Sequence, residues 1–203
     1  MLQAFFFFRR LNVKTFFTLL QVLQPELERF MTDESASLLD STTGSEKITM
    51  VARRVLPGLR HYSSWLMSNP ALLAADMGDT SLTVQIKELW RTYANTLTLL
   101  AATFPVPDLP SIDYLLEEDE DTLGFKPFEK DPNSTRYDVQ AKRARLSKYH
   151  DHGIERHHPN IEMLGRVREF LTDGLELAVQ YEVSQHRYTE MDADDIFRTS
   201  QST

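Results

Sequence analysis

Residues 81–104 read SLTVQIKELWRTYANTLTLLAATF and place an apolar side chain at every third or fourth position. These positions are Leu82, Ile86, Leu89, Tyr93, Leu97, Leu100 and Phe104. Because an α-helix repeats every 3.6 residues, side chains with this spacing share one face. Such a face normally packs into a hydrophobic core. The segment therefore predicts an amphipathic helix that ends at Pro105.

Three further segments show the same period. Their apolar positions are Phe16, Leu20, Leu23, Leu27 and Phe30; Ile48, Val51, Val55, Leu59, Tyr62 and Leu66; and Ile161, Leu164, Val167, Leu171, Leu175 and Ala178. Consecutive helices joined by short connections usually pack antiparallel. We therefore predict an all-α fold of stacked antiparallel helical hairpins, similar in kind to an α-solenoid.

Polar residues indicate where the helices begin. Thr43 and Glu46 have the spacing of a capping box just before the second segment. Asp79 or Ser81 can cap the third segment.

Proline and glycine inside the predicted helices indicate bends and close contacts. We expect Pro25 to kink or divide the first helix and Pro57 to bend the second. Gly165 and Gly174 lower helix propensity in the last helix, so we expect each to mark close packing against a neighbour.

Composition excludes several kinds of chemistry. The 203 residues include 22 basic and 30 acidic side chains, a net charge of −8, and no cysteine. The absence of cysteine excludes disulfides, thiolate metal sites and cysteine nucleophiles, and it favours an intracellular protein. The few glycines are too widely spaced to form a phosphate-binding loop.

The amino-terminal run Phe5 to Phe8 does not resemble a secretion signal, because Arg9 and Arg10 follow the apolar run instead of preceding it. No stretch approaches the ~20 apolar residues of a membrane span. We interpret Phe5 to Leu23 as the buried flank of a first helix. The expected location is the nucleus, the cytoplasm or both.

An acidic segment occupies the middle of a proline-containing loop, residues 105–132. We expect its apolar residues Leu116, Leu123, Phe125 and Phe128 to be buried anchors and its acidic residues to be mostly exposed. The acidic run can dock a basic partner, or it can anchor arginines of neighbouring helices. The candidate docking or structural residues are Glu117, Glu118, Asp119, Glu120, Asp121, Phe125 and Phe128.

The charge reverses after this loop. Residues 136–168 carry eight basic and four acidic side chains. A basic helix face can neutralise nucleic-acid phosphates, although it can also be a solvated face that balances the acidic loop. The candidate phosphate contacts are Arg136, Lys142, Arg143, Arg145 and Lys148, with Lys142, Arg145 and Lys148 expected along one helix.

Other chemistry is weakly supported. His150, His152, His157 and His158 could ligate a metal, but an exposed loop explains them better. No Gly-x-Ser-x-Gly motif is present, and adjacent solvated carboxylates are poor acid–base catalysts. We therefore expect no enzyme activity, no metal and no cofactor.

Four stretches carry a family resemblance. They are LNVKTFFTLLQVLQPELE (11–28), VLPGLRHYSSWL (55–66), LWRTYA (89–94) and, most strongly, YLLEEDEDTLGFKPF (114–128). They resemble fungal members of the ever-shorter-telomeres family, which includes a telomerase accessory subunit and the Smg proteins of nonsense-mediated mRNA decay. The resemblance covers roughly Phe5 to Phe197. It implies an all-helical domain of the DNA/RNA-binding type, which we place at residues 1–187, before a mostly disordered acidic and polar tail at 188–203.

In longer relatives, a helical-repeat module with a 14-3-3-like phosphopeptide pocket precedes this domain. The present sequence begins inside the family pattern without that module and shows no following PIN-type nuclease, so neither activity is carried over.

The resemblance implies a non-enzymatic, nucleic-acid-associated scaffold of mRNA decay or telomere maintenance. Its expected partners are RNA or single-stranded DNA, and mRNA-decay or telomerase-associated proteins. The alternative is a protein–protein adaptor without nucleic-acid contact, which the net charge of −8 favours.

Overall fold

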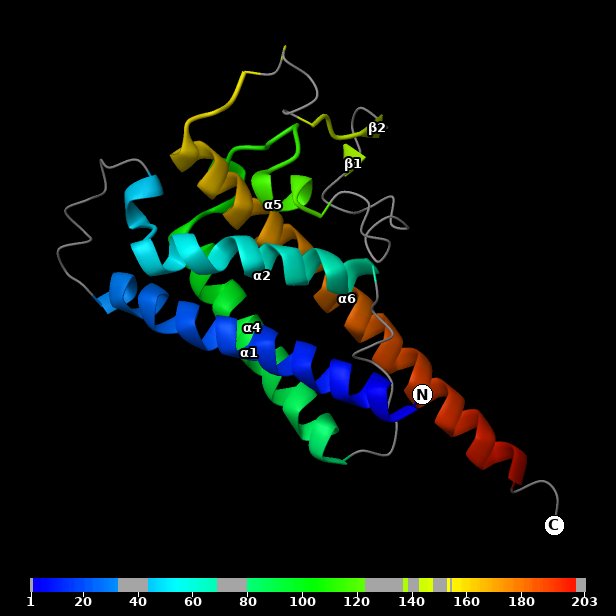
Figure 1. Ribbon diagram of the computed structural model, residues 1–203. Coiled ribbons are helices and arrows are strands. Elements are labelled where there is room, and N and C mark those ends of the chain that lie inside the picture. The colour runs from blue at the N-terminus through cyan, green and yellow to red at the C-terminus, as the bar shows by residue number, and fades with distance from the viewer. Residues whose placement is uncertain are drawn as a thin grey trace.

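The computed structural model describes residues 2–32, 44–68, 80–122, 137–138, 143–147, 153 and 155–199. Within them, the long helices are α1 (Leu2–Thr32), α2 (Met50–Ser68), α4 (Thr80–Thr103) and α6 (Pro159–Thr199) (Figure 1). The short elements are η2 (Gly44–Lys47), η3 (Val106–Asp108), α5 (Glu117–Glu120), β1 (Tyr137–Asp138) and β2 (Arg143–Ala144). The predicted all-α class is confirmed.

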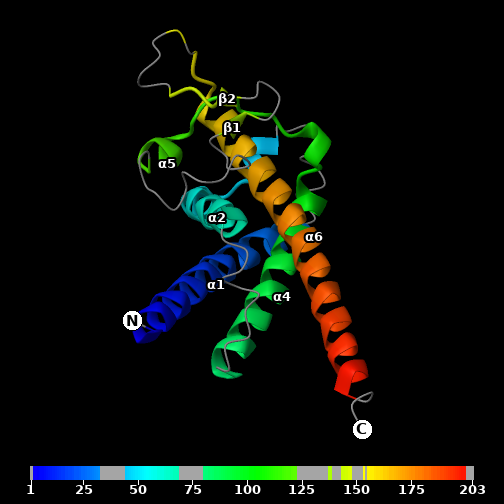
Figure 2. The ribbon, with the colours of Figure 1, turned by 90° about the vertical axis from the view of Figure 1, so that its right-hand side faces the viewer.

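The long helices form two antiparallel pairs, α1 with α2 and α4 with α6 (Figures 1 and 2). α1 packs against both α2 and α4, and α6 packs against the same two helices. Each long helix therefore has two neighbours, and the four enclose one core. None of the described helices is long and apolar enough to cross a membrane.

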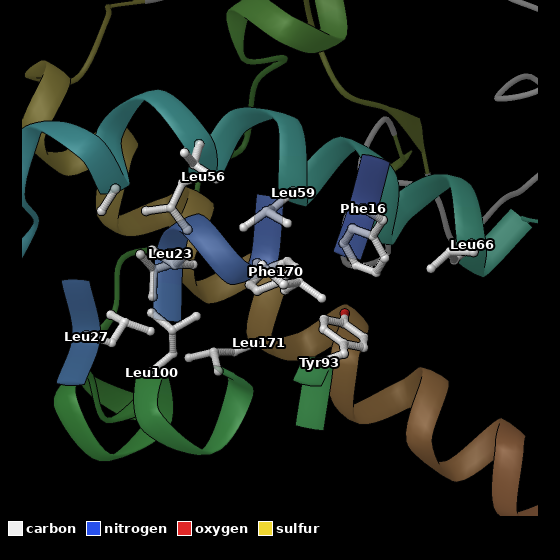
Figure 3. Packing of buried hydrophobic residues seen from close by; sticks show 14 of the residues in the cluster. Phe16, Leu23, Leu27, Leu56, Leu59, Leu66, Tyr93, Leu100, Phe170 and Leu171 are labelled. Carbon is white, nitrogen blue, oxygen red and sulfur yellow. The ribbon is translucent and has the colours of Figure 1, made fainter. Parts of the chain in front are cut away.

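A chain of aromatic rings crosses this core. Phe16 of α1 stacks on Tyr62 of α2, with ring centroids 5.6 Å apart, and meets Tyr93 of α4 edge-on at 5.2 Å. Tyr93 then contacts Phe170 of α6 at 5.4 Å. Each long helix supplies one ring, so the four helices share a common centre; three of these rings are labelled in Figure 3.

The apolar spacing identified most of the buried positions. All seven predicted positions of the third segment are buried except Leu97, which is partly buried against the core. In the second segment, Val51 is exposed although Val55, Leu59 and Leu66 are buried.

The predicted buried face of the last helix was wrong at its edges. Leu175 is 69% exposed and Ile161 37%, whereas Phe170 and Leu177 are buried instead. The apolar face of α6 is broader than one spacing pattern, so the sequence alone did not fix its rotation.

The helix starts also differ from the predictions. The hydroxyl of Thr49 accepts a hydrogen bond from the Ala52 N–H at 3.1 Å and caps α2, while Glu46 lies in η2. Ser81 lies inside α4. Thr43 and Asp79 lie outside the described residues.

Pro25 and Pro57 both lie inside helices. α1 continues past Pro25 to Thr32, so the proline does not divide the helix, and α2 continues past Pro57 to Ser68. α6 continues to Thr199, and the disorder expected for the tail at residues 188–203 stays a prediction. The domain boundary at residue 187 stays a prediction.

The amino-terminal half of α1 is not the uniformly buried flank that we predicted. Phe7, Phe8 and Leu11 are 63%, 60% and 49% exposed. Arg9 is buried, and the burial of apolar residues begins at Val13 and Phe16, where α1 lies in the core.

Gly165 and Gly174 mark close packing, as predicted. A Cβ atom at Gly165 would overlap the buried Ile112 side chain, and one at Gly174 would overlap the Leu97 methyl groups. At Gly58 of α2, in contrast, an added Cβ would lie 3.6 Å from Leu19, an ordinary contact.

We expect Gly165→Ala to lower the free energy of unfolding by up to about 2 kcal/mol. Overpacking costs about 1–3 kcal/mol, and the gain of about 1 kcal/mol in helix propensity offsets part of that cost. Urea denaturation measures the difference. The matched variant is Gly58→Ala, which gains propensity without overlap and should raise stability by up to about 1 kcal/mol. Equal stabilisation by both would contradict the close packing at Gly165.

Candidate functional site: a buried arginine–carboxylate cluster

Backbone contacts hold the start of the acidic segment in place. Leu115 N–H donates to the Leu146 carbonyl at 2.9 Å, and Tyr114 forms a parallel bridge with Leu146. Leu116 N–H donates to Asp119 Oδ2 at 3.1 Å. Tyr114, Leu115 and Leu116 are buried, so the four-residue helix α5 follows directly after a buried, hydrogen-bonded segment.

Arg60 of α2 is the centre of the site and has no exposed surface. Its Nη1 donates to Asp119 Oδ1 at 3.0 Å and its Nη2 to Asp119 Oδ2 at 2.7 Å, a two-pronged contact that matches the planar guanidinium. Nη1 also donates to Glu118 Oε1 at 3.0 Å. Nε donates to Glu169 of α6. One guanidinium thus joins α2, α5 and α6.

Two further arginines complete the cluster. Arg166 of α6 donates from Nε and Nη2 to the two carboxylate oxygens of Glu118, at 2.8 Å each. Arg145, just after β2, donates to Glu169. Three arginines therefore face the carboxylates of Glu118, Asp119 and Glu169, and their formal charges balance.

The pKa shifts follow from this balance. Burial alone would lower the pKa of Arg60, but the carboxylates of Glu169, Asp119 and Glu118 outweigh burial and raise it. Burial would likewise raise the pKa values of Glu118 and Asp119. Arg166 and Arg60 outweigh burial at Glu118, and Arg60 does so at Asp119, so both pKa values are lowered. All three groups stay charged at neutral pH.

A fourth carboxylate lies beside the cluster without an arginine of its own. Burial, followed by the negative charge of Glu169, raises the pKa of Asp173 to about 7, although Arg60 and a hydrogen bond with Ser63 oppose the shift. Ser63 also shares a 2.9 Å hydrogen bond with the Tyr93 hydroxyl. Burial raises the pKa of Tyr93 as well, so this hydroxyl stays protonated.

The acidic residues are only partly where we expected them. Glu117 and Asp121 are exposed, but Asp119 is 1% exposed, and Glu118 and Glu120 are half-buried. The contacts of Glu118 and Asp119 are those of an anchor for arginines of neighbouring helices. Leu116 is buried as predicted.

The other members of the acidic loop are less fully described. Ser147 donates to Glu120 at 2.9 Å, which ties α5 to the segment after β2. Docking of a partner at Glu117 and Asp121 stays a prediction. Leu123, Phe125 and Phe128 lie outside the described residues.

The candidate phosphate contacts do not form the expected helix. Arg143 lies in β2, where its backbone is opposite Asp138 of β1 in the antiparallel register. Residues 145–147 are not helical. Arg145 is 14% exposed and bound to Glu169, so its charge is used inside the protein. Arg136, Lys142 and Lys148 lie outside the described residues.

Of the candidate histidines, His157 packs against Tyr114, and His158, which is exposed, accepts a hydrogen bond from the Asn160 N–H. His157 stacks on Tyr114 with ring centroids 5.8 Å apart, and its backbone N–H donates to the Tyr114 hydroxyl at 3.0 Å. That hydroxyl donates to Glu162 at 2.8 Å. Across the described ranges, no group of side chains is arranged to hold a metal ion. His150 and His152 lie outside those ranges.

Sequence reasoning missed Arg60, Arg166, Glu169 and Asp173. One signal was present: Arg60 follows Leu59 directly within an apolar segment, at the edge of the predicted buried face. A charge at that position needs a buried partner, but spacing along the chain does not identify the partner.

The fold and this cluster define an all-helical domain held together by buried ion pairs. The family model described as the Est1 DNA/RNA binding domain matches residues 2–132, and the chain belongs to that family. Comparisons with curated proteins and with solved structures give no match. The matched stretch contains Arg60, Glu118 and Asp119, whereas Arg145, Arg166 and Glu169 follow it.

Replacing Arg60 tests the cluster. We expect Arg60→Met to lower the free energy of unfolding by about 3–5 kcal/mol, because it leaves Asp119 buried without its cation and removes one of the two arginines that pair with Glu169. Urea denaturation measures the change. The control is Arg91→Met, which removes an exposed 3.0 Å pair with Glu88 and should cost about 1 kcal/mol at most. Equal losses of stability in the two variants would show that the buried ion pairs of Arg60 contribute no more to stability than the exposed pair of Arg91.

The raised pKa of Asp173 predicts a pH dependence. The folded state holds this proton up to about pH 7, whereas the unfolded chain releases it near the ordinary value of 3.8. Folding stability from this group therefore falls as pH rises from about 4 to about 7, by about 1.4 kcal/mol for each unit of pKa difference. Asp173→Asn removes the decline, so the variant should gain stability over wild type as pH rises.

The groups facing Asp173 are Glu169 and Glu176 of α6, Arg60 and Ser63 of α2, and Tyr93 of α4. Denaturation at several pH values gives the difference between Asp173→Asn and wild type. Asp113→Asn, at an exposed carboxylate that is not among these groups, is the control and should follow wild type at every pH. A pH-independent difference for Asp173→Asn would contradict the raised pKa.

Proposed function

We propose that this chain is a non-enzymatic, nucleic-acid-associated scaffold of the telomerase-accessory or mRNA-decay type. The observation that carries the proposal is the family match, which spans α1, α2, α4 and α5. RNA or single-stranded DNA is the proposed ligand. The proposed protein partners are mRNA-decay or telomerase-associated factors, in the nucleus or the cytoplasm.

The structure supports a scaffold with a rigid centre. The arginines and carboxylates of the cluster around Arg60 balance one another in charge and are engaged in mutual ion pairs. Among the described residues, its arginines are also turned inward, so a phosphate would have to compete with buried carboxylates to reach them. Surface cations must supply the contacts with a nucleic acid.

The basic residues Arg136, Lys142, Arg143 and Lys148 remain proposed phosphate contacts. Of these, Arg143 lies in β2, which is paired with β1. Arg145 is left out of this set because Glu169 holds it.

Fluorescence anisotropy with labelled RNA and labelled single-stranded DNA tests the function. We expect weak binding with a dissociation constant of roughly 10⁻⁴ to 10⁻⁶ M that weakens steeply with added salt. Lys142→Glu with Arg143→Glu should weaken it further and flatten the salt dependence. Arg145 is left unchanged, because a glutamate there would face Glu169 and destabilise the fold.

The control variant reverses two exposed charges at a distance from this segment, Arg54→Glu in α2 and Lys87→Glu in α4. It has the same net charge as the test variant, so a selective loss in the test variant assigns the contact to residues 142–143. Equal losses in both would reduce the effect to net charge alone.

The alternative function is a protein–protein adaptor. Large apolar side chains are exposed on two helices, Leu175 (69%) and Val179 (55%) on α6 and Val84 (60%) on α4. Exposed apolar groups of this size are typical of protein interfaces when they gather in one patch. If wild-type protein binds neither strand even at low salt, the adaptor replaces the scaffold.

A further inference from the structure

The amino-terminal half of α1 presents a face that the core does not use. Phe7, Arg10, Leu11 and Lys14 follow the spacing i, i+3, i+4 and i+7, which places them on one side of the helix, and all four are exposed. Arg9, Val13 and Phe16 are buried on the opposite side of the helix. This face lies at the end of the bundle marked N in Figures 1 and 2.

Two aromatic rings stand together on this part of the helix. Phe7 and Phe8 are 63% and 60% exposed, and their ring centroids lie 5.7 Å apart at an interplanar angle of 76°. Exposed phenylalanine rings are costly in water, and an edge-on pair keeps a ring face open on each partner. The pair is therefore available to a flat ligand.

The charge of the same stretch is opposite to that of the chain. The first 25 residues contain Arg9, Arg10 and Lys14 and no acidic residue, and the first acidic residue is Glu26. All 30 acidic residues of the chain follow, with the other 19 basic ones. Arg9 is buried, so the surface of this stretch carries the two exposed cations Arg10 and Lys14. A local cationic surface on a protein of net charge −8 favours a polyanionic ligand.

We propose that the exposed side of α1, which carries Phe7, Arg10 and Lys14 and has Phe8 at its edge, binds single-stranded nucleic acid. Bases stack on the two phenylalanine rings, and the backbone phosphates contact Arg10 and Lys14. Proteins that bind single strands without sequence preference combine cations that follow the backbone with aromatic rings that stack bases. The inference rests on the proposed function and places the ligand inside the segment that matches the family.

Compared with a single strand, double-stranded nucleic acid fits this site less well. Its bases are already stacked and paired, so they cannot lie on Phe7 and Phe8, and a duplex could use only the two cations. The site should therefore prefer a single strand to a duplex, with little preference for sequence.

Two variants separate stacking from charge. Phe7→Leu with Phe8→Leu keeps both side chains apolar but removes the ring faces. We expect it to weaken binding of a mixed-sequence single strand about tenfold or more, and to leave binding of an abasic sugar–phosphate strand unchanged. Arg10→Gln with Lys14→Gln should weaken binding of both strands and lower the slope of log K against log salt by about 1.4.

The control is Arg54→Gln with Lys87→Gln, which removes two exposed charges elsewhere and should retain both the affinity and the salt slope of wild type. Circular dichroism confirms that each variant keeps its helix content, which is expected because the substituted side chains are exposed. Ultraviolet crosslinking to the labelled strand, followed by mass spectrometry, should place the crosslink at Phe7 or Phe8.

The outcomes distinguish this inference from the proposed function. If wild type binds, but both α1 variants bind as wild type does, the α1 site is wrong while the function stands. If the Phe variant loses affinity equally for the mixed-sequence and abasic strands, the rings do not stack bases, and the inference is also overturned. If wild type binds no strand at low salt, the function and the site both fail, and the exposed face belongs to a protein partner.

Discussion

The buried guanidinium of Arg60 is the constraint on which the rest of the structure depends. A charge with no exposed surface costs several kcal/mol unless carboxylates surround it. Asp119 and Glu118 come from the acidic loop and Glu169 from α6, so satisfying one side chain of α2 fixes the positions of two other elements. Arg166 and Arg145 then neutralise the remaining carboxylate charge. Asp173 has no arginine of its own, which is why its pKa rises while those of Glu118 and Asp119 fall.

The cluster also divides the cations of the protein into two groups. Arg60, Arg145 and Arg166 are committed to internal pairs and have 0%, 14% and 7% of their side chains exposed. These three arginines add to the number of basic residues in the sequence, but their charges are neutralised inside the protein and do not attract a ligand. A ligand meets cations such as Arg10 and Lys14, which lie on the outer face of α1. A count of basic residues along the chain does not make this distinction, and the assignment of Arg145 to a phosphate illustrates the difficulty.

Apolar spacing was a good guide to the fold and a poor guide to the site. It identified the buried faces of α1 and α4 correctly, because hydrophobic burial is local and repeats with the helix. The prediction for Asp119 came from charge instead of apolar spacing. A run of five acidic residues normally predicts a solvated segment, so the burial of Asp119 was not expected. The partners of Arg60 lie 59 and 109 residues away along the chain, and no local pattern carries that information. Phe7 and Phe8 show the opposite error, because they were predicted to be buried and are exposed. An apolar run predicts burial without indicating which element would cover it.

The folded unit extends beyond the segment that matches the family. The match ends at residue 132, yet α6 supplies Val167 and Phe170, both with no exposed surface, to the same core as α1, α2 and α4. α6 also supplies Glu169 and Arg166 to the cluster. Without them, Arg60 would lose one carboxylate, and Glu118 would lose the arginine that holds both of its oxygens. The charge balance that permits a buried arginine in the matched segment therefore requires residues outside it, so α6 is part of the domain and not an appendage.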